Sequence, residues 1–385
     1  MDEAYYTVCM SLFGDLFTKK GESVLGIDIG SSSIKVVQLR RKAGKAVLET
    51  YGELSLGPYA GVEIGRATQL PVEKIVAALR DLLKEANTTT KSCGISIGAS
   101  SSLLSFIRMP TMDQKQLATM IPIEARKYIP VPITEVALDW WIVPREENSI
   151  SEFEKAPTAT QVKEAQTAAQ KGVDVLLVVI HNDVLSRLNQ IAQGTQITPS
   201  FFEIEIWSSM RSAVDQSLEP VMVFDMGAAS TKLYVIERGI LRSSHTINRG
   251  SQDLTLALSQ SMGLSIGDAE HMKRTVGISQ DDEHKAQREV FELNLDYVFS
   301  ETNRVISGYE HKYGKPISKV ILTGGGSLLK GFLDLARKKF QTEIVLGDPF
   351  SKCEAPAFLE PVLRTAGPEF AVAIGIALRK LQENE

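Results

Sequence analysis

The sequence has few of the residues from which disulfide frameworks and metal clusters are built. Its three cysteines, Cys9, Cys93 and Cys353, are odd in number and scattered, and its five histidines form no HxxxH or similar cluster. This pattern excludes a disulfide scaffold and a zinc site with regular spacing. It favours a protein that is kept in a reducing cytosol.

Long apolar runs and an excess of positive charge are also missing. No run reaches the roughly 18 apolar residues that a membrane-spanning helix needs. The start, MDEAYY, lacks the basic and apolar regions of a signal peptide. The net charge of −5 gives no support for a nucleic-acid partner. We therefore expect no transmembrane segment and no nucleic-acid binding.

The chain is otherwise of ordinary globular composition, with 385 residues, 43% hydrophobic and 23% charged. This length favours two domains. Near the start, residues 10–20 place four apolar side chains at helical spacing, which predicts either a helix docked on its own domain or a short interfacial contact with a membrane or partner. These side chains are Leu12, Phe13, Leu16 and Phe17.

One sequence pattern occurs twice. An apolar strand ends in an aspartate, a turn of small residues follows, and a second strand carries a lysine. Both aspartate-to-lysine spacings are seven residues (28 to 35; 225 to 232), and the copies lie 197 residues apart (225 − 28). The first copy, in residues 24–37, contains Asp28, Gly30, Ser31, Ser32, Ser33 and Lys35, and the second, in residues 221–235, contains Asp225, Gly227, Ala228, Ala229, Ser230, Thr231 and Lys232.

The residue types of this pattern suit phosphate chemistry. Glycine and small side chains leave backbone N–H groups uncovered, so that an anion can approach them. An aspartate repels phosphate but can hold a hydrated Mg²⁺ that bridges to phosphate oxygens. The lysine is a point charge that can reach a phosphate. Two copies in opposite halves of the chain therefore predict a phosphate and magnesium site, with Asp28 and Asp225 near the metal.

The paired loops resemble the two phosphate loops of the actin, Hsp70 and sugar-kinase superfamily. The stretch GIDIGSSSIKVVQL is similar in particular to the PilM family, actin-like proteins of type IV pilus assembly that are related to the division protein FtsA. The resemblance runs from about residue 23 to 380. It implies an α/β fold with two actin-like (ribonuclease H-like) halves, an inserted subdomain of the FtsA/PilM type, and a cleft that binds ATP and Mg²⁺.

The resemblance also predicts a role in nucleotide binding for two further motifs. LTGGGSLLKG, with Gly324, Gly325, Gly326 and Ser327, resembles the adenosine motif of the superfamily, although a triple glycine alone also suits a structural turn. Glu270 and Lys273 share one helix face at i, i+3. They form either a surface ion pair or, as in FtsA-like proteins, the nucleoside side of the site, where Glu270 accepts hydrogen bonds from ribose hydroxyls. The intervening His271 and Met272 have no counterpart in that pattern.

Glu205 is the candidate for catalysis. In actin-like proteins an acidic residue before the connecting helix positions the attacking water. A carboxylate that favours the dipole of that helix is an equally valid interpretation, and Glu203 is an alternative to Glu205. We expect the catalytic set to comprise Glu205, Asp28 and Asp225, with ATP binding and at most slow hydrolysis.

The expected elements include a helix from Asp113, as N-cap, through Tyr128, which Pro122 kinks or breaks. Further helices are expected at about 203–216, 328–340 and 370–381, with residues 354–366 as a loop. Residues 145–171, charged and rich in Ala, Gln and Thr, predict a mobile loop or an exposed helix.

The predicted domain organisation follows from the resemblance. After an N-terminal segment, residues 1–22, domain I comprises residues 23–93 and 173–217, with residues 366–385 returning to it as a C-terminal helix. Residues 94–172 form an inserted partner-binding subdomain, and domain II spans residues 218–365.

Three functions are compatible with these observations. The first is a cytoplasmic ATP-binding scaffold of type IV pilus assembly, which links the membrane complex to the motor and associates with the inner membrane through a partner. The second is an FtsA-like, filament-forming division protein, disfavoured by the ending LRKLQENE, which has no apolar anchor. The third is a small-molecule kinase of the same superfamily, for which the sequence offers no acceptor pocket.

By resemblance, the partner of the scaffold is the cytoplasmic N-terminal tail of the single-span protein PilN. We expect this tail to bind in extended form in a groove between the inserted subdomain and domain I. Trp140 and Trp141 of the insertion are either part of that groove or core residues. Other pilus components and self-association are further possible contacts.

Overall fold

The computed structural model describes residues 7–8, 22–144 and 172–383. The predictions for residues 10–20 and 145–171 therefore lie outside the described residues. The chain divides into two compact units, one formed by Met1–Gly98 with Arg187–Glu385 and the other by Ala99–Ser186. Each is described by itself.

The first sheet of the larger unit has the strand order β1-β4-β3-β2-β5-β9. The strands β2, β3 and β4 form an antiparallel meander, and β5 and β9 continue the sheet in parallel to β2. The meander turns from β3 to β4 at Ala43 and Gly44, which both have positive φ. The strands are β1 (Thr7–Val8), β2 (Ser23–Ile29), β3 (Ser33–Lys42), β4 (Lys45–Ser55), β5 (Ser92–Ile97) and β9 (Thr198–Ile204).

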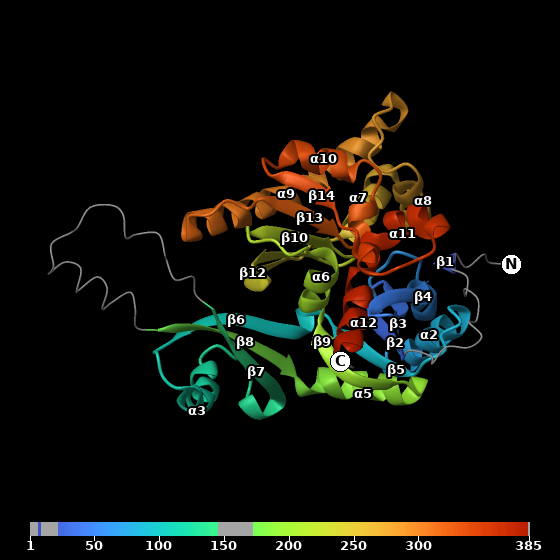
Figure 1. Cartoon of the computed structure of the whole chain (residues 1–385). Helices are drawn as coiled ribbons and strands as arrows, with labels where there is room; N and C mark the ends of the chain where they lie inside the picture. Colours follow the sequence, from blue (N-terminus) through green and yellow to red (C-terminus); the bar gives the residue numbers. More distant parts are fainter. Residues whose placement is uncertain (1–6, 9–21, 145–171, 384–385) are drawn as a thin grey trace, which may run out of the picture. The chain divides into compact units, whose positions relative to one another are not determined.

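The second sheet repeats this design in the order β12-β11-β10-β13-β14. Again three strands form an antiparallel meander, and two more run parallel to its first strand. Both sheets lie within the larger unit (Figure 1). The strands are β10 (Val221–Met226), β11 (Thr231–Glu237), β12 (Ile240–Ile247), β13 (Lys319–Thr323) and β14 (Glu343–Leu346). The doubling that the two sequence copies predict is therefore confirmed at the level of whole sheets.

The helices of the larger unit cover these sheets (Figure 1). Phe224, Phe291, Phe299 and Phe332 are fully buried in one core that joins the second sheet to its helices. The helices are α1 (Gly57–Ala60), α2 (Val72–Glu85), α5 (Asn182–Thr195), which begins in the smaller unit, α6 (Glu205–Ala213), α7 (Ser251–Met262), α8 (Ile266–Thr275), α9 (Lys285–Tyr313), α10 (Phe332–Lys339), α11 (Glu360–Ala366) and α12 (Ala371–Glu383).

The C-terminal helix α12 packs closely on the first sheet and on α6. A Cβ at Gly26 of β2 would overlap the backbone of Ala373, and a Cβ at Gly375 would overlap the backbone of Ser208. Glycine at these two positions therefore lets α12 approach β2 and α6 closely. The stretch Ala357–Glu383, which includes α11 and α12, is the one helical segment among the described residues with the length and composition of a membrane span, but 61% of its most apolar window is buried.

The smaller unit contains a three-stranded antiparallel sheet in the order β6-β8-β7, with β6 (Ser102–Met109), β8 (Val173–His181) and β7 (Val136–Val143). Helix α3 (Gln114–Ala125) packs its buried Leu117 and Ile121 on one face, where Trp140 also lies. Asp113 caps α3 in a capping box, as expected from the sequence. The central strand β8 belongs to this compact unit, whereas the predicted inserted segment ends at residue 172.

Four local expectations differ from the structure. The helix expected through Tyr128 ends at Ala125, and Pro122 lies inside it without breaking it. The helix expected from residue 203 begins at Glu205, so Glu203 belongs to β9. The helix expected over residues 328–340 is preceded by a 3₁₀ turn, Gly325–Leu328, and begins at Phe332. Residues 354–366, expected as a loop, contain α11, which starts with a proline near its first position.

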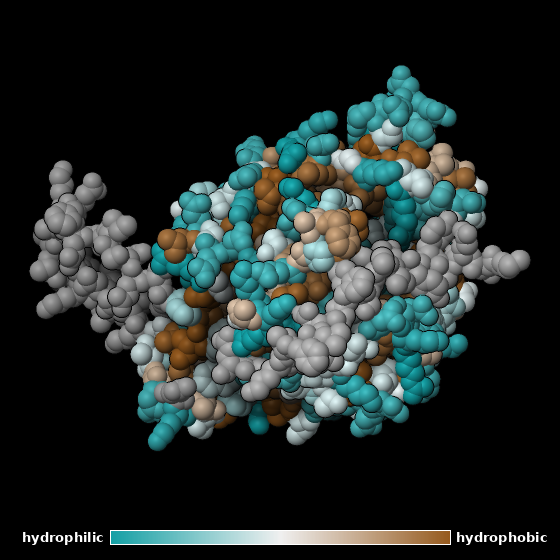
Figure 2. Space-filling view, turned by 45° about the vertical axis from the view of Figure 1, so that its right-hand side comes forward, coloured by the Kyte–Doolittle hydropathy of each residue, from teal (hydrophilic) through white to brown (hydrophobic). Residues whose placement is uncertain are grey.

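The surface carries scattered hydrophobic side chains. On the face that Figure 2 shows, hydrophobic residues (brown) are interspersed with hydrophilic ones (teal). The most exposed large hydrophobic residues, Leu218, Leu293 and Phe358, lie far apart in the sequence. Isolated exposures of this kind are normal for a folded protein and indicate no interface by themselves.

Candidate functional site

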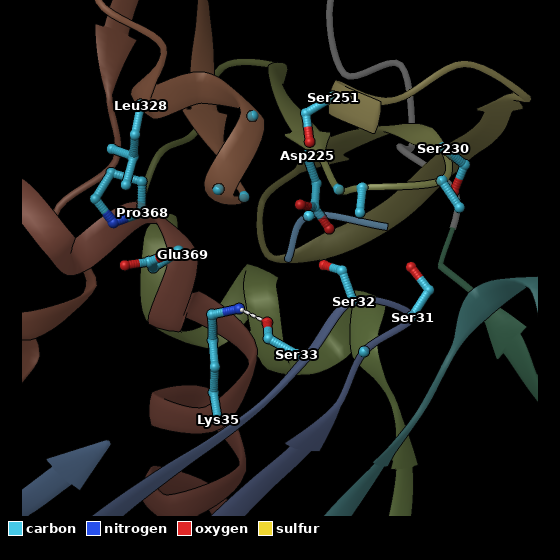
Figure 3. A pocket seen from close by; sticks show the side chains of 18 of the residues that line it. Ser31, Ser32, Ser33, Lys35, Asp225, Ser230, Ser251, Leu328, Pro368 and Glu369 are labelled. Carbon is cyan, nitrogen blue, oxygen red and sulfur yellow. Dashed lines mark hydrogen bonds between the residues drawn. The ribbon is translucent and has the colours of Figure 1, made fainter. Parts of the chain in front are cut away.

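A cavity of about 370 Å³ lies within the larger unit, bordered by both small-residue turns. Its volume is in the range of small-molecule sites. Figure 3 shows Ser31 and Ser32 on one side of it, with Asp225 and Ser230 opposite. Eighteen of the residues predicted as site residues line the cavity, namely Asp28, Gly30, Ser31, Ser32, Ser33, Lys35, Glu205, Asp225, Gly227, Ala228, Ala229, Ser230, Lys232, Glu270, Lys273, Gly324, Gly325 and Gly326. Thr231 and Ser327 are the two predicted residues outside the lining.

The two turns have the same backbone geometry. In the first, the N–H of Gly30 donates to the carbonyl of Ser33 at 3.0 Å, and in the second, the N–H of Gly227 donates to the carbonyl of Ser230, also at 3.0 Å. We name them turn 1 (Gly30–Ser33) and turn 2 (Gly227–Ser230). Each closes an antiparallel pair in which the aspartate lies directly opposite the lysine, Asp28 opposite Lys35 and Asp225 opposite Lys232.

Directly opposed residues on antiparallel strands point to the same face of the sheet. The seven-residue spacing therefore brings one carboxylate and one ammonium group together at each turn, and the repeat brings both pairs to one cavity.

Three carboxylates form the most acidic part of the cavity. Glu205 accepts a hydrogen bond from Lys232 Nζ at 3.0 Å, and Asp225 Oδ2 lies 3.9 Å from the same nitrogen. Asp28 accepts from the hydroxyl of Ser96 at 2.7 Å. Burial, together with the charges of Glu205 and Asp28, raises the pKa of Asp225 to about 6 although Lys232 opposes the shift. Burial and the charge of Glu205 also raise the pKa of Asp28. The positive charge around the two aspartates is thus insufficient to offset their burial and the neighbouring carboxylates.

The lysine of turn 1 is held by neighbours that the repeat did not predict. Lys35 Nζ donates to Ser33 Oγ at 2.7 Å, as Figure 3 shows, and forms an ion pair with Glu53 at 2.9 Å. Burial would lower the pKa of Lys35, but Glu53, Glu369 and Asp28 together raise it above its usual value. Both turn lysines are therefore charged and occupied by protein carboxylates.

The third glycine motif approaches Asp225 closely. Gly324 has a φ of +80°, and a Cβ there would overlap Oδ1 of Asp225. Its N–H donates to the carbonyl of Pro368 at 2.8 Å. Ser327 donates its hydroxyl to the carbonyl of Gly324 at 2.7 Å, so this side chain stabilises its own turn instead of facing the cavity. Glycine is required at residue 324 by both its conformation and its space.

Glu270 and Lys273 of α8 form a buried pair in the cavity wall, which excludes the alternative of a surface ion pair. Their exposed fractions are 4% and 7%, and Glu270 Oε2 lies 2.6 Å from Lys273 Nζ. Glu270 also accepts hydrogen bonds from Thr255 Oγ1 at 2.6 Å and from Arg274 Nε at 2.7 Å. Burial raises the pKa of Glu270, but these partners outweigh it and hold the pKa below its usual value. An ionised acceptor therefore faces the cavity.

The structure places Glu203 and Glu205, the two candidates for the water-positioning residue, in different surroundings. Glu205 lines the cavity, whereas Glu203 is held between Arg211 and Arg379, with contacts of 2.8 Å to each. Ser208 donates a further hydrogen bond to Glu203. Glu203 thus belongs to an ion-pair cluster, and of the two only Glu205 can reach a bound molecule.

Sequence reasoning missed several lining residues, chiefly Glu53, Gly65, Ser251, Arg274, Pro368 and Glu369. Glu53 lies directly opposite Lys35 on β4, so the register of the meander could have identified it. Glu369 follows α11 and had no such signal. Burial and the neighbouring Glu53 raise the pKa of Glu369 to about 7, against the effects of Lys35 and Arg274.

Known structures of similar fold cover almost the whole chain. A chain of the PilM–PilN type IV pilus biogenesis complex matches with a TM-score of 0.73 and 22% identity, over 93% of this chain and 98% of that one. The ethanolamine utilization protein EutJ from Carboxydothermus hydrogenoformans matches with a TM-score of 0.53 and 13% identity, over 96% and 92%. The predicted actin-like α/β fold is thereby confirmed.

Two FtsA proteins and one family model are among the matches to the sequence. The cell division protein FtsA of Agrobacterium fabrum is 25% identical over 232 residues, which cover 54% of this chain and 51% of FtsA. FtsA of Neisseria meningitidis serogroup B is 28% identical over 187 residues, 43% of this chain and 44% of that protein. The chain thus spans about half the length of the curated relatives it matches. The model of the type IV pilus assembly protein PilM matches residues 26–381, nearly the whole chain, and the chain therefore belongs to the PilM family.

Proposed function

We propose that this protein binds Mg-ATP between turn 1 and turn 2 and acts as a nucleotide-dependent scaffold of type IV pilus assembly. The observation that carries the nucleotide proposal is the pair of equal turns at one cavity, each with an aspartate and a lysine. Backbone N–H groups of small-residue turns suit phosphate oxygens. Family membership supports the pilus role.

The carboxylates fit a hydrated magnesium ion. Burial, together with repulsion from the neighbouring carboxylates, raises the pKa values of Asp28 and Asp225. Among the described residues no three His, Cys, Asp or Glu side chains are placed to hold a metal directly. Mg²⁺ usually keeps several waters and takes one or two carboxylates plus phosphate oxygens. Asp28 and Asp225 would hold it in this way, and the ion would neutralise charge between carboxylates and phosphates.

The glycine-rich wall of the cavity suits a nucleoside. Gly324, Gly325 and Gly326 offer uncovered backbone, and Leu328 adds an apolar wall. The ionised carboxylate of Glu270 can accept hydrogen bonds from ribose hydroxyls. Its partner Lys273 keeps it charged and in place.

Glu205 is the proposed water-positioning residue, and slow turnover is expected. Its ion pair with Lys232 occupies one carboxylate oxygen and fixes the side chain. A single fixed carboxylate can orient a water molecule but offers little further catalysis. Turnover should therefore be slow even when binding is tight.

Isothermal titration calorimetry with Mg-ATP tests the nucleotide proposal. Asp28→Asn and Asp225→Asn should each weaken binding, because each removes a charge beside the metal. Asp215→Asn, at an exposed position outside the cavity lining, is the matched control and should bind like the wild type. Unchanged affinity in both cavity variants would contradict the site. Single-turnover hydrolysis that is unaltered in Glu205→Ala would contradict the role of Glu205.

For the partner, we propose the cytoplasmic N-terminal tail of PilN, with the smaller unit taking part in its binding. A structure of similar fold is a PilM–PilN complex, which supports this choice. In the smaller unit, Ile123 and Tyr128 are exposed close in sequence to the basic Arg126 and Lys127, and Phe106 and Ile142 are exposed on its sheet. These residues offer apolar anchors and charge to an extended peptide. Such tethering would place the protein at the inner membrane through its partner.

Titration of the labelled protein with a PilN-tail peptide tests this. NMR or hydrogen-exchange changes should include residues 99–144 and 172–186 of the smaller unit. Changes confined to residues 218–365, or none at peptide concentrations well above micromolar, would refute it.

A further inference from the structure

The loop between α1 and α2 links the two turns of the proposed nucleotide site. On the side of turn 1, the N–H of Thr68 donates to the carbonyl of Ser31 at 2.8 Å, and the hydroxyl of Thr68 donates to the same oxygen at 3.2 Å. This loop, residues 61–68, is therefore fixed to the first of the two turns.

The same loop is also bonded to the other half of the larger unit. The N–H of Ala67 donates to Oε1 of Gln252, near the start of α7, at 3.0 Å. The N–H of Gln252 in turn donates to the carbonyl of Ala228 in turn 2 at 3.0 Å. A continuous path thus runs from turn 1 through the loop and Gln252 to turn 2. Its one non-covalent step between the loop and α7 is the side-chain bond of Gln252.

A second contact lies beside this path. Gly65 lines the cavity with a φ of +89°, and a Cβ there would overlap the carboxylate of Glu270. The loop therefore lies directly against the residue proposed for the ribose. Gln252 itself does not line the cavity. Its side chain acts on the site only through the loop.

We propose that Gln252 is a positioning residue that holds the 61–68 loop across the site, fixes the separation of turn 1 and turn 2, and slows nucleotide release. This inference rests on the proposed nucleotide function. Separation of the turns, or movement of the loop away from Glu270, would ease the release of a nucleotide held by both turns. Both motions strain the path between the turns, in which the bond between Ala67 and Gln252 joins the loop to α7.

Two substitutions isolate this bond. Gln252→Met keeps the length of the side chain and removes the acceptor, whereas Gln252→Glu keeps an acceptor oxygen for the N–H of Ala67. Gln260→Met makes the same change on the same helix at an exposed residue outside the cavity lining, and serves as the matched control.

The experiment is stopped-flow release of a fluorescent ATP analogue with Mg²⁺, together with hydrogen exchange of residues 61–70. Gln252→Met should speed release by about two- to tenfold, the effect of losing one hydrogen bond, with little change in the association rate. It should also speed exchange at Ala67. Gln252→Glu should restore the slow exchange, and Gln260→Met should behave as the wild type.

The possible failures are distinguishable. If the wild type binds no analogue, the proposed nucleotide function is refuted, and the inference with it. If the wild type binds but Gln252→Met releases at the wild-type rate, or Gln260→Met speeds release equally, only the role of Gln252 is overturned.

Discussion

Replacing Glu203 by glutamine should destabilise the protein without touching its nucleotide site. Glu203 is 7% exposed and accepts hydrogen bonds from three side chains, at 2.8 and 2.9 Å from Arg211, 2.8 Å from Arg379 and 2.5 Å from Ser208. Removing one partner of a buried ion pair costs about 3–5 kcal/mol. The two arginines here keep about a quarter to a third of their side chains exposed, so solvent screening reduces the expected cost to about 2–3 kcal/mol.

This loss of stability is measurable as a fall in the melting temperature. In a unit of this size, 1 kcal/mol corresponds to about 2–4 °C, so Glu203→Gln should lower the melting temperature by about 4–12 °C in a circular dichroism scan at pH 7. Glu205→Gln is the matched variant. It loses an ion pair with Lys232 but relieves the repulsion with Asp28 and Asp225, so it should change the melting temperature less than Glu203→Gln does while it slows turnover.

The pH dependence gives a second check on Glu203. Its pKa is lowered in the folded protein, because the arginines and Ser208 outweigh burial. Its contribution is therefore present above the ordinary glutamate pKa of about 4.3 and is lost as the pH falls through the lowered value. Equal melting temperatures for the wild type and Glu203→Gln at pH 7, or a larger loss in Glu205→Gln, would refute the assignment of the two glutamates.

Two more substitutions follow from the cavity. Gly324→Ala should abolish nucleotide binding in calorimetry while circular dichroism still shows a folded chain, because the added Cβ would overlap Asp225 and the backbone has positive φ; binding at wild-type affinity would contradict this. Glu369→Gln should raise the melting temperature above pH 7 and have no effect near pH 4.5. The pKa of Glu369 is raised from 4.5 to about 7 in the folded protein, so this carboxyl group destabilises the folded protein increasingly as the pH rises from about 4.5 to 7. The gain should reach at most about 3 kcal/mol, and a gain that is constant with pH would contradict the reasoning.

The repeated turn was predictable from sequence because its geometry is local. Asp28 and Lys35 face each other whenever a tight turn joins two antiparallel strands, and the same holds for Asp225 and Lys232. The meeting of the two copies at one cavity follows from the resemblance to actin-like proteins, since no local rule brings residues 197 positions apart together.

The remaining residues of the site are brought there by tertiary contacts, which the hydrophobic periodicity of the sequence does not reveal. Glu369 enters the cavity from the segment between α11 and α12, and Gly65 enters from a loop that the sequence marks only as polar and rich in glycine. The predicted helix start at residue 203 was wrong for a related reason. The pairing of β9 with β5 continues through Ile204, so tertiary hydrogen bonding keeps Glu203 in a strand.

The central claim is that Asp28 and Asp225 hold Mg²⁺ against a nucleotide lying between the two turns. The most direct test compares ATP affinity with Mg²⁺ and with a chelator, in the wild type and in the double variant Asp28→Asn, Asp225→Asn. We predict that Mg²⁺ strengthens ATP binding in the wild type and has little effect in the double variant. An equal effect of Mg²⁺ in both proteins would contradict the claim.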